Sequence, residues 1–187
     1  MSPNRTRQSR PYRDLERPMH DLGSCCARPE RRPSASRIES MPSTFVIVTD
    51  ADVSARELFE ISLDIDAHVS SMQQSGERAI AGTTSATIGL GETVTWRARH
   101  FGIWFAMTSK ITTLEKPTRF VDQQVRGPFR TFVHEHRFEA VGDGCRMTDT
   151  VTVGSPIFGR LAERTVLVPY LRHLIIKRNT HLLAELA

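Results

Sequence analysis

The stretch from Phe129 to Val153, FRTFVHEHRFEAVGDGCRMTDTVTV, decides the fold. Apolar residues recur at alternate positions on both sides of Gly142-Asp143, which is typical of two antiparallel strands joined by a two-residue turn. Such a turn brings four pairs onto one face of the hairpin: Phe138 with Met147, His136 with Asp149, His134 with Val151, and Phe132 with Val153. This face is largely apolar, so we expect it to point into the core.

A second hairpin is predicted around Phe101-Gly102. Its turn pairs His100 with Ile103, Ala98 with Phe105, Trp96 with Met107, and Val94 with Ser109. The positions between them are mostly polar, so the apolar face packs inward and the other face meets water. Both hairpins therefore present one largely apolar face to a core.

The strand between these hairpins, Phe120–Arg126, has no settled register. The inward residues are Phe120, Asp122 and Gln124 if a two-residue turn lies at Lys116-Pro117, and Val121, Gln123 and Val125 if it lies at Gly127-Pro128. One of these loops must contain a bulge or have another length, and the sequence leaves open which one.

The order of elements predicts the fold class. The expected strands are Thr44–Thr49, Glu77–Ala81, Glu92–His100, Ile103–Leu114, Phe120–Arg126, Phe129–Val141 and Cys145–Val153. Two short helices follow the first strand, one capped by Asp52 or Ser54 and one near Asp66–Met72. The last segment, Phe158–Leu186, is a long amphipathic helix that Pro169 either kinks or begins. We expect an α+β fold in which a curved antiparallel sheet of about seven strands wraps this helix.

Composition and charge favour one globular domain. The chain has 187 residues, of which 39% are hydrophobic and 25% charged. Residues 1–40 contain nine arginines and five acidic residues, which account for the whole net charge of +4. Residues 41–187 are therefore neutral and lack the basic footprint that binds phosphates, so we expect no nucleic-acid binding from the folded domain.

Residues 1–40 differ from the rest of the chain. They are rich in Arg, Pro and Ser and contain few large apolar residues, which predicts a disordered extension. Two explanations remain: a basic arm that contacts an acidic partner, or a translation start placed too early, with Met41 as the native beginning. Composition favours the second explanation. We therefore assign residues 41–187 to the ligand-binding domain.

The spacing of the cysteines and the hydropathy of the chain indicate where in the cell the protein is located. Cys25, Cys26 and Cys145 have neither zinc-site spacing nor the even number of a disulfide framework. No stretch has the roughly 20 apolar residues of a membrane span, and the N-terminus has no apolar signal-peptide core. We expect a cytoplasmic protein without stable membrane insertion, whose oligomeric state the sequence leaves open.

Short motifs spread over residues 41–187 carry a family resemblance. They are Gly89-Leu90-Gly91-Glu92 before Thr95-Trp96, His100-Phe101-Gly102, Pro117 with Phe120-Val121-Asp122, Gly127-Pro128-Phe129, His134-Glu135-His136-Arg137-Phe138, Met147-Thr148-Asp149, and Pro156 with Gly159. Through them the chain resembles the polyketide cyclase/dehydrase group of the SRPBCC (START, Bet v 1-like) superfamily. The resemblance implies a helix-grip fold with a deep pocket between the sheet and the C-terminal helix. It also implies either a lipid or sterol carrier or an aromatase/cyclase.

The first functional hypothesis is the binding of a small hydrophobic or aromatic molecule, such as a lipid, a polyketide or an isoprenoid-like compound, without a cofactor. Apolar walls with a few convergent polar groups are typical of ligand sites, although the same pattern also describes a plain core. The predicted binding residues are Trp96, Ala98, Phe105, Met107, Phe132, His134, Phe138, Met147, Leu171 and Ile175.

The second hypothesis is a cofactor-free cyclase or dehydratase. Opposed residues on one face of a sheet lie close enough for His136 and Asp149 to form an imidazole–carboxylate pair, in which Asp149 orients a general base. The alternative role for this pair is a buried hydrogen bond that anchors the hairpin. No Ser or Cys stands in a nucleophile motif.

Two further readings remain. His134 and His136 could ligate a metal with Asp149 or Glu135, but Glu135 points to the opposite face, which leaves at most three ligands, and we expect no metal site. The basic residues of the last helix, Arg178 among them, are expected to form a solvated face. A non-catalytic interaction module is the remaining class, and it predicts a filled core and an exposed apolar patch.

Overall fold

The computed structural model describes residues 41–155 and 159–187. The predicted extension, residues 1–40, and Pro156 of the family motifs lie outside the described residues. Among the residues described, no helix combines the length and the apolar character that crossing a membrane requires.

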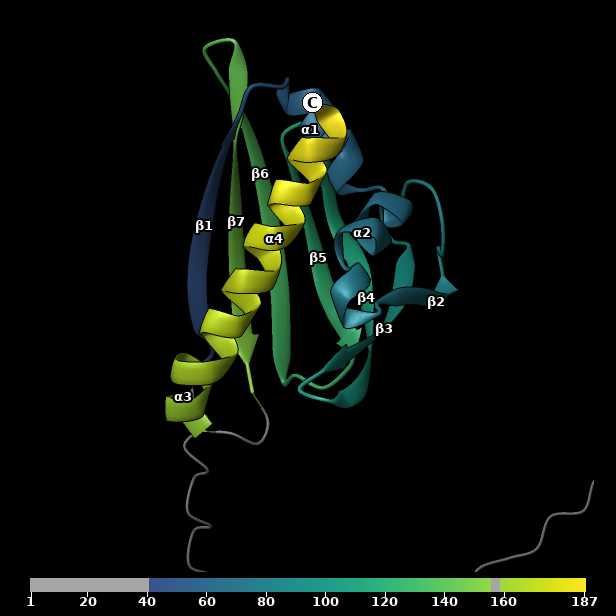
Figure 1. Cartoon of the computed structure of the whole chain (residues 1–187), viewed down its shortest axis with the longest axis vertical. Helices are drawn as coiled ribbons and strands as arrows, with labels where there is room; N and C mark the ends of the chain where they lie inside the picture. Colours follow the sequence, from purple (N-terminus) through teal and green to yellow (C-terminus); the bar gives the residue numbers. More distant parts are fainter. Residues whose placement is uncertain (1–40, 156–158) are drawn as a thin grey trace, which may run out of the picture. The chain divides into compact units, whose positions relative to one another are not determined.

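Seven antiparallel strands form one curved sheet in the order β1-β7-β6-β5-β4-β3-β2 (Figure 1). Their bounds are β1 Ser43–Ala51, β2 Arg78–Gly82, β3 Thr93–His100, β4 Ile103–Glu115, β5 Arg119–Arg126, β6 Thr131–Val141 and β7 Gly144–Gly154. From β2 to β7 each strand pairs with the next along the chain, and β1 closes the sheet against β7. The α+β fold with about seven strands is confirmed.

Two short helices follow β1, as predicted: α1 spans Ala55–Ser62 and α2 spans Ile65–Ser71, followed by a 3₁₀ turn at Gln73–Ser75. Ser54 rather than Asp52 caps α1, because the Glu57 amide donates to the Ser54 hydroxyl (3.2 Å) while the Ser54 amide donates to the Glu57 carboxylate (3.0 Å). These reciprocal bonds satisfy two amides that the first turn of a helix leaves unpaired.

The C-terminal helix has three parts: α3 Gly159–Ala162, a π-helical turn at Glu163–Leu167, and α4 Val168–Leu186. Pro169 lies in the first turn of α4, where its missing N–H costs little, so it marks the start of the long helix. The wider turn before it contains the buried Glu163, whose carboxylate accepts from the Ser43 amide (3.1 Å) and the Ser155 amide (2.7 Å). Glu163 thereby ties the start of the helix to β1 and to the residue that follows β7.

Helix α4 crosses the concave side of the sheet (Figure 1). It packs against β1, α1 and α2. One apolar cluster lies at the α1 end of the sheet, around Phe59, Phe120 and Phe138, and another at the opposite end of β6 and β7, around Phe132 and Val151. Between these clusters, the inward residues of β6 and β7 are the polar His134, His136 and Asp149, and the candidate site lies there.

Both predicted hairpin registers are confirmed, because His100 pairs with Ile103 and His136 pairs with Asp149. The open register of β5 is also settled. Lys116–Thr118 joins β4 to β5 and Gly127–Arg130 joins β5 to β6, so neither loop is a two-residue turn. Two irregularities in the β4–β5 pairing absorb the mismatch. Phe120 therefore pairs with His136 and Asp122 with His134, which brings Asp122 to the concave face.

Candidate functional site

A cavity of about 760 Å³ lies between the concave face of the sheet and the C-terminal helix. Most of its wall is apolar. Of the residues predicted to bind ligand or carry catalysis, those that line it are Trp96, Ala98, Phe105, Met107, Phe132, His134, His136, Leu171 and Ile175. The pairing of β3 with β4 and of β6 with β7 aims the strand residues among them at the helix.

Three predicted site residues lie outside the cavity wall. Phe138 and Met147 belong to the core cluster, where Phe59 of α1 packs edge-on against Phe138 with ring centroids 5.3 Å apart. Helix α1 thus occupies the space that the hairpin pattern left open above these residues. Asp149 is fully buried behind the two histidines. The roles of all these residues in binding or catalysis stay predictions.

Asp149 contacts both histidines of β6. Its Oδ1 accepts a hydrogen bond from Nε2 of His134 (3.0 Å) and lies 2.7 Å from Nδ1 of His136. The second contact is a close charge pairing, because the ring N–H of His136 is not aimed at the oxygen. One carboxylate oxygen therefore holds the near nitrogens of two neighbouring rings, whose centroids are 3.8 Å apart.

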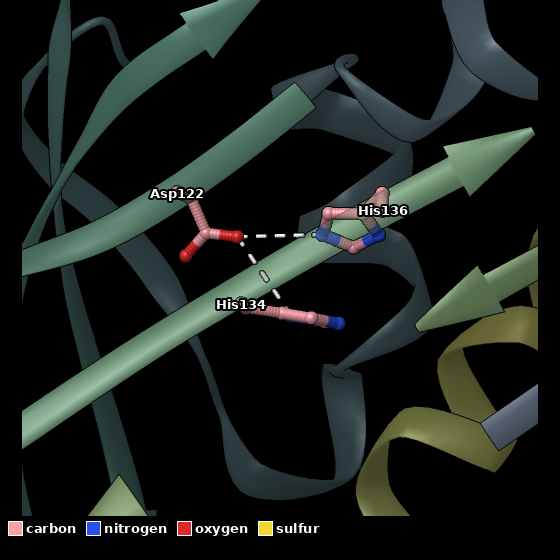
Figure 2. A group of neighbouring side chains, drawn as sticks. All are labelled: Asp122, His134 and His136. Atoms are coloured by element: carbon pink, nitrogen blue, oxygen red, sulfur yellow. Dashed lines mark hydrogen bonds and ion pairs between the residues drawn. The ribbon is translucent and has the colours of Figure 1, made fainter. Parts of the chain in front are cut away.

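Asp122 faces the other side of the same rings (Figure 2). Its Oδ2 lies 3.3 Å from Nε2 of His136, within hydrogen-bonding distance, and 3.7 Å from Nδ1 of His134. The Asp122 side chain is 21% exposed and lines the cavity, whereas Asp149 is sealed from it. Asp122, His134 and His136 are also the group of described residues whose ligand-type atoms lie close enough together to hold a metal.

Helix α4 completes this polar group with two buried residues. Asn179 donates to Oδ2 of Asp149 (2.7 Å) and to the Thr49 hydroxyl (3.1 Å). Arg178 donates to the Ser62 carbonyl at the end of α1 (2.9 Å) and to the side-chain oxygen of Asn179 (3.3 Å). Arg178 lines the cavity and is only 6% exposed, so its predicted place on a solvated face is wrong.

The surroundings shift the pKa values of His134 and His136 in opposite directions. Burial lowers the pKa of His136, but the charge of Asp149 and the hydrogen bond to Asp122 outweigh burial and raise that pKa above its ordinary value. Burial and the neighbouring charge of His136 lower the pKa of His134. Burial opposes ionisation of Asp149, yet the two histidines hold its pKa well below the usual range. His136 therefore holds a proton more strongly than His134 does.

Ser109 adds an unpaired hydroxyl to the cavity wall. Its side chain is 3% exposed, and its Oγ has no hydrogen-bond partner among the described residues. Buried hydroxyls are normally paired, so this one is available to a polar atom of a ligand.

Aromatic side chains surround the end of the cavity near the β3–β4 turn. Nδ1 of His100 is hydrogen-bonded to the Tyr170 hydroxyl of α4 at 2.8 Å. The ring of Phe101 lies 4.5 Å from that of Tyr170 and is 65% exposed. Phe101 and Gly102 are the two turn residues, and both have the positive φ (51° and 80°) that a two-residue hairpin turn of this kind requires.

Solved structures share this architecture at low sequence identity. The protein TTHA0849 from Thermus thermophilus is 16% identical, with a TM-score of 0.62, over 78% of this chain and 100% of that chain. The Zhui aromatase/cyclase from Streptomyces sp. R1128 is 12% identical, with a TM-score of 0.62, over 77% of this chain and 93% of that one. Ginseng major latex-like protein 151 from Panax ginseng is 13% identical, with a TM-score of 0.57, over 78% and 97%.

These similarities confirm the helix-grip fold that the sequence resemblance implied. No protein-family model matches the chain, and no curated protein matches its sequence. At these identities the likeness concerns the fold alone, so function must be argued from the cavity.

Proposed function

We propose that the chain binds a small, largely apolar molecule, such as a lipid, a polyketide or an isoprenoid-like compound, between the sheet and α4. The cavity of about 760 Å³ carries this proposal. Ligand sites have volumes of roughly 300–1,000 Å³, apolar walls and a few placed polar groups. The cavity matches each of these features. A cytoplasmic location is part of the proposal, and the buried free thiol of Cys145 agrees with it.

The polar groups indicate how the ligand lies. Asp122, His136 and Arg178 meet the cavity from β5, β6 and α4, and Ser109 of β4 adds its unpaired hydroxyl. The rest of the wall offers mainly dispersion contacts and apolar surface. The preferred ligand therefore has a polar end with oxygen atoms at this group and an apolar body toward the remaining walls.

A matched pair of substitutions tests the proposal. Ala98 lines the cavity from β3, whereas Ala106 lies on the opposite, exposed face of β4. Ala98→Phe fills the cavity, and Ala106→Phe adds the same side chain to the convex face. We expect 1-anilinonaphthalene-8-sulfonate to bind wild type and Ala106→Phe alike, and to bind Ala98→Phe at least tenfold more weakly. Equal binding by all three proteins contradicts the proposal.

Native mass spectrometry of the full chain, purified from cells, gives a second measurement. A bound small molecule should be released on denaturation and should be absent from Ala98→Phe. The hypothesis of a non-catalytic interaction module predicts a filled core, and the cavity argues against that hypothesis. A protein that is empty from every host and binds no apolar probe would restore that alternative.

A cofactor-free cyclase or dehydratase is the second candidate, favoured by the contact of His136 with Asp149. The charge of Asp149 and the hydrogen bond to Asp122 raise the pKa of His136, which favours a general-acid role toward a ligand carbonyl over a general-base role. The test is turnover of a poly-β-keto thioester by His136→Gln. Unchanged turnover would exclude the role, whereas a loss of at least a hundredfold in kcat supports it.

A further inference from the structure

We propose that Asp122, His134 and His136 form a binding site for a divalent first-row transition metal at the polar wall of the cavity. The sequence offered no third ligand on the concave face besides Asp149. The register of β5 supplies one, because Asp122 pairs with His134 and faces the same space as both imidazoles (Figure 2).

The spacing of the three ligand atoms suits one ion. Oδ2 of Asp122 lies 3.3 Å from Nε2 of His136 and 3.7 Å from Nδ1 of His134. With metal bonds of about 2.0–2.2 Å, neighbouring ligand atoms of a tetrahedral ion are roughly 3.3–3.6 Å apart. All three ligand atoms lie within 4.8 Å of one another, so side-chain rotations can bring them to coordination distance.

Asp149 selects the nitrogens that face the ion. It accepts a hydrogen bond from Nε2 of His134, which places the N–H of that ring on the Asp149 side. Its charge lies 2.7 Å from Nδ1 of His136 and favours a proton on that nitrogen as well. The lone pairs of Nδ1 of His134 and Nε2 of His136 then point toward Asp122. A carboxylate that holds the far nitrogen of a ligating histidine is the usual second contact of protein metal sites, and here one carboxylate serves two rings.

Charge and ligand type favour the same ion class. Asp122 and Asp149 carry two negative charges against one positive charge on Arg178, so the group attracts a cation when both rings are neutral. A metal ion and a proton compete for the same lone pair on Nε2 of His136, so metal binding requires that nitrogen to be unprotonated. Two imidazoles and one carboxylate suit Zn²⁺, Fe²⁺ or Co²⁺ better than Ca²⁺ or Mg²⁺. The remaining coordination positions open into the cavity.

Cobalt binding tests the site without an assay of activity. The full chain, with Cys25→Ser and Cys26→Ser to remove competing thiols, is stripped with a chelator and titrated with Co²⁺. We expect one ion per chain, with visible d–d absorption. Asp122→Asn should weaken binding by at least tenfold, while His181→Gln, which alters a histidine paired with Glu185 on α4, should not.

Three results would overturn the site: no Co²⁺ bound by the Cys25→Ser/Cys26→Ser chain, unchanged affinity in Asp122→Asn, or a loss in His181→Gln as large as in Asp122→Asn. If Asp122→Asn fails to fold, imidazole NMR of the Cys25→Ser/Cys26→Ser chain decides. Paramagnetic Co²⁺ should shift the ring signals of His134 and His136 strongly and leave those of His181 near their positions. A strong shift of His181 with none of His134 excludes the proposed site.

Discussion

The side-chain amide of Asn179 donates a hydrogen bond of 2.7 Å to the fully buried carboxylate of Asp149, and this bond joins α4 to the middle of the sheet. The same amide reaches Thr49 on β1, and its oxygen accepts from Arg178. Asn179 therefore has every polar atom engaged, and the helix is fixed where the two apolar clusters meet.

Replacement of Asn179 by Leu should destabilise the fold. It leaves Oδ2 of Asp149 buried without its donor, and a lost hydrogen bond to a charged group costs about 1.5–3 kcal/mol. Urea unfolding should report a loss of this size. The control is Thr180→Val, where the hydroxyl is exposed and bonds within its own helix to the Ile176 carbonyl. Equal losses in both variants would contradict the role of Asn179.

Phe59 should carry much of the stability at the α1 end. Its side chain is 1% exposed and lies edge-on to Phe120 and Phe138, with ring centroids 5.7 and 5.3 Å away. We expect Phe59→Ala to lower the free energy of unfolding by about 3–5 kcal/mol. Phe101→Ala, at an exposed ring, should change it by less than about 0.5 kcal/mol. A small effect of Phe59→Ala in urea unfolding would show that the α1 end is loosely packed.

Ser109→Ala should not harm the ligand-free protein. The serine hydroxyl is buried without a partner among the described residues, and such a group costs about 1–3 kcal/mol. Removing it should leave the melting temperature of ligand-free protein unchanged or raise it. The gain in melting temperature on adding an oxygen-bearing ligand should be smaller in the variant. A marked destabilisation of the ligand-free variant would show that the hydroxyl is already satisfied.

His100 should make stability depend on pH. Burial lowers its pKa more than the charge of Glu77 raises it, and Tyr170 is its hydrogen-bond partner. The folded chain therefore resists a proton that the unfolded chain binds near pH 6.5. The folded chain therefore keeps its full stability above about pH 6.5, where His100 is neutral in both states, and loses stability as the pH falls toward the pKa of His100 in the folded chain.

Comparison with His100→Gln isolates the effect of that ring. Between about pH 7.5 and about pH 5.5, wild type should lose stability relative to His100→Gln in urea unfolding. A constant difference between the two proteins over this range, or a relative gain by wild type on acidification, would contradict the depressed pKa.

The alternation of apolar and polar residues around a tight turn predicted the strand registers that such a turn determines. Two-residue turns at Phe101-Gly102 and Gly142-Asp143 fix the register on both sides, so the opposition of His136 and Asp149 followed from counting. The amphipathic pattern of Phe158–Leu186 and the order of the elements extended this to the C-terminal helix. The element bounds agree with the prediction to within a few residues because turn residues separate strongly patterned strands.

Features that depend on irregular or distant contacts were out of reach. Asp122 could not be placed because pairing irregularities in β4 and β5 change the count. Arg178 resembled the solvent-facing cations of its helix, and only the Ser62 carbonyl and the carboxylates of Asp149 and Asp122 explain its burial. Phe138 and Met147 carried the same alternation as Phe132, but α1 covers them, which the hairpin alone does not reveal.

Glu163 and Asn179 attach the C-terminal helix at two points, through the Ser43 and Ser155 amides and through Asp149. Between these anchors, Tyr170 lines the cavity and is held to His100 by a single hydrogen bond, with the exposed ring of Phe101 beside it. We expect the proposed ligand to enter and leave by rotation of Tyr170 and Phe101 rather than by departure of the helix. Because side-chain rotations are fast, the space that opens between Tyr170 and Phe101 should determine how long a ligand stays in the cavity. Bulky ligands should then stay longest.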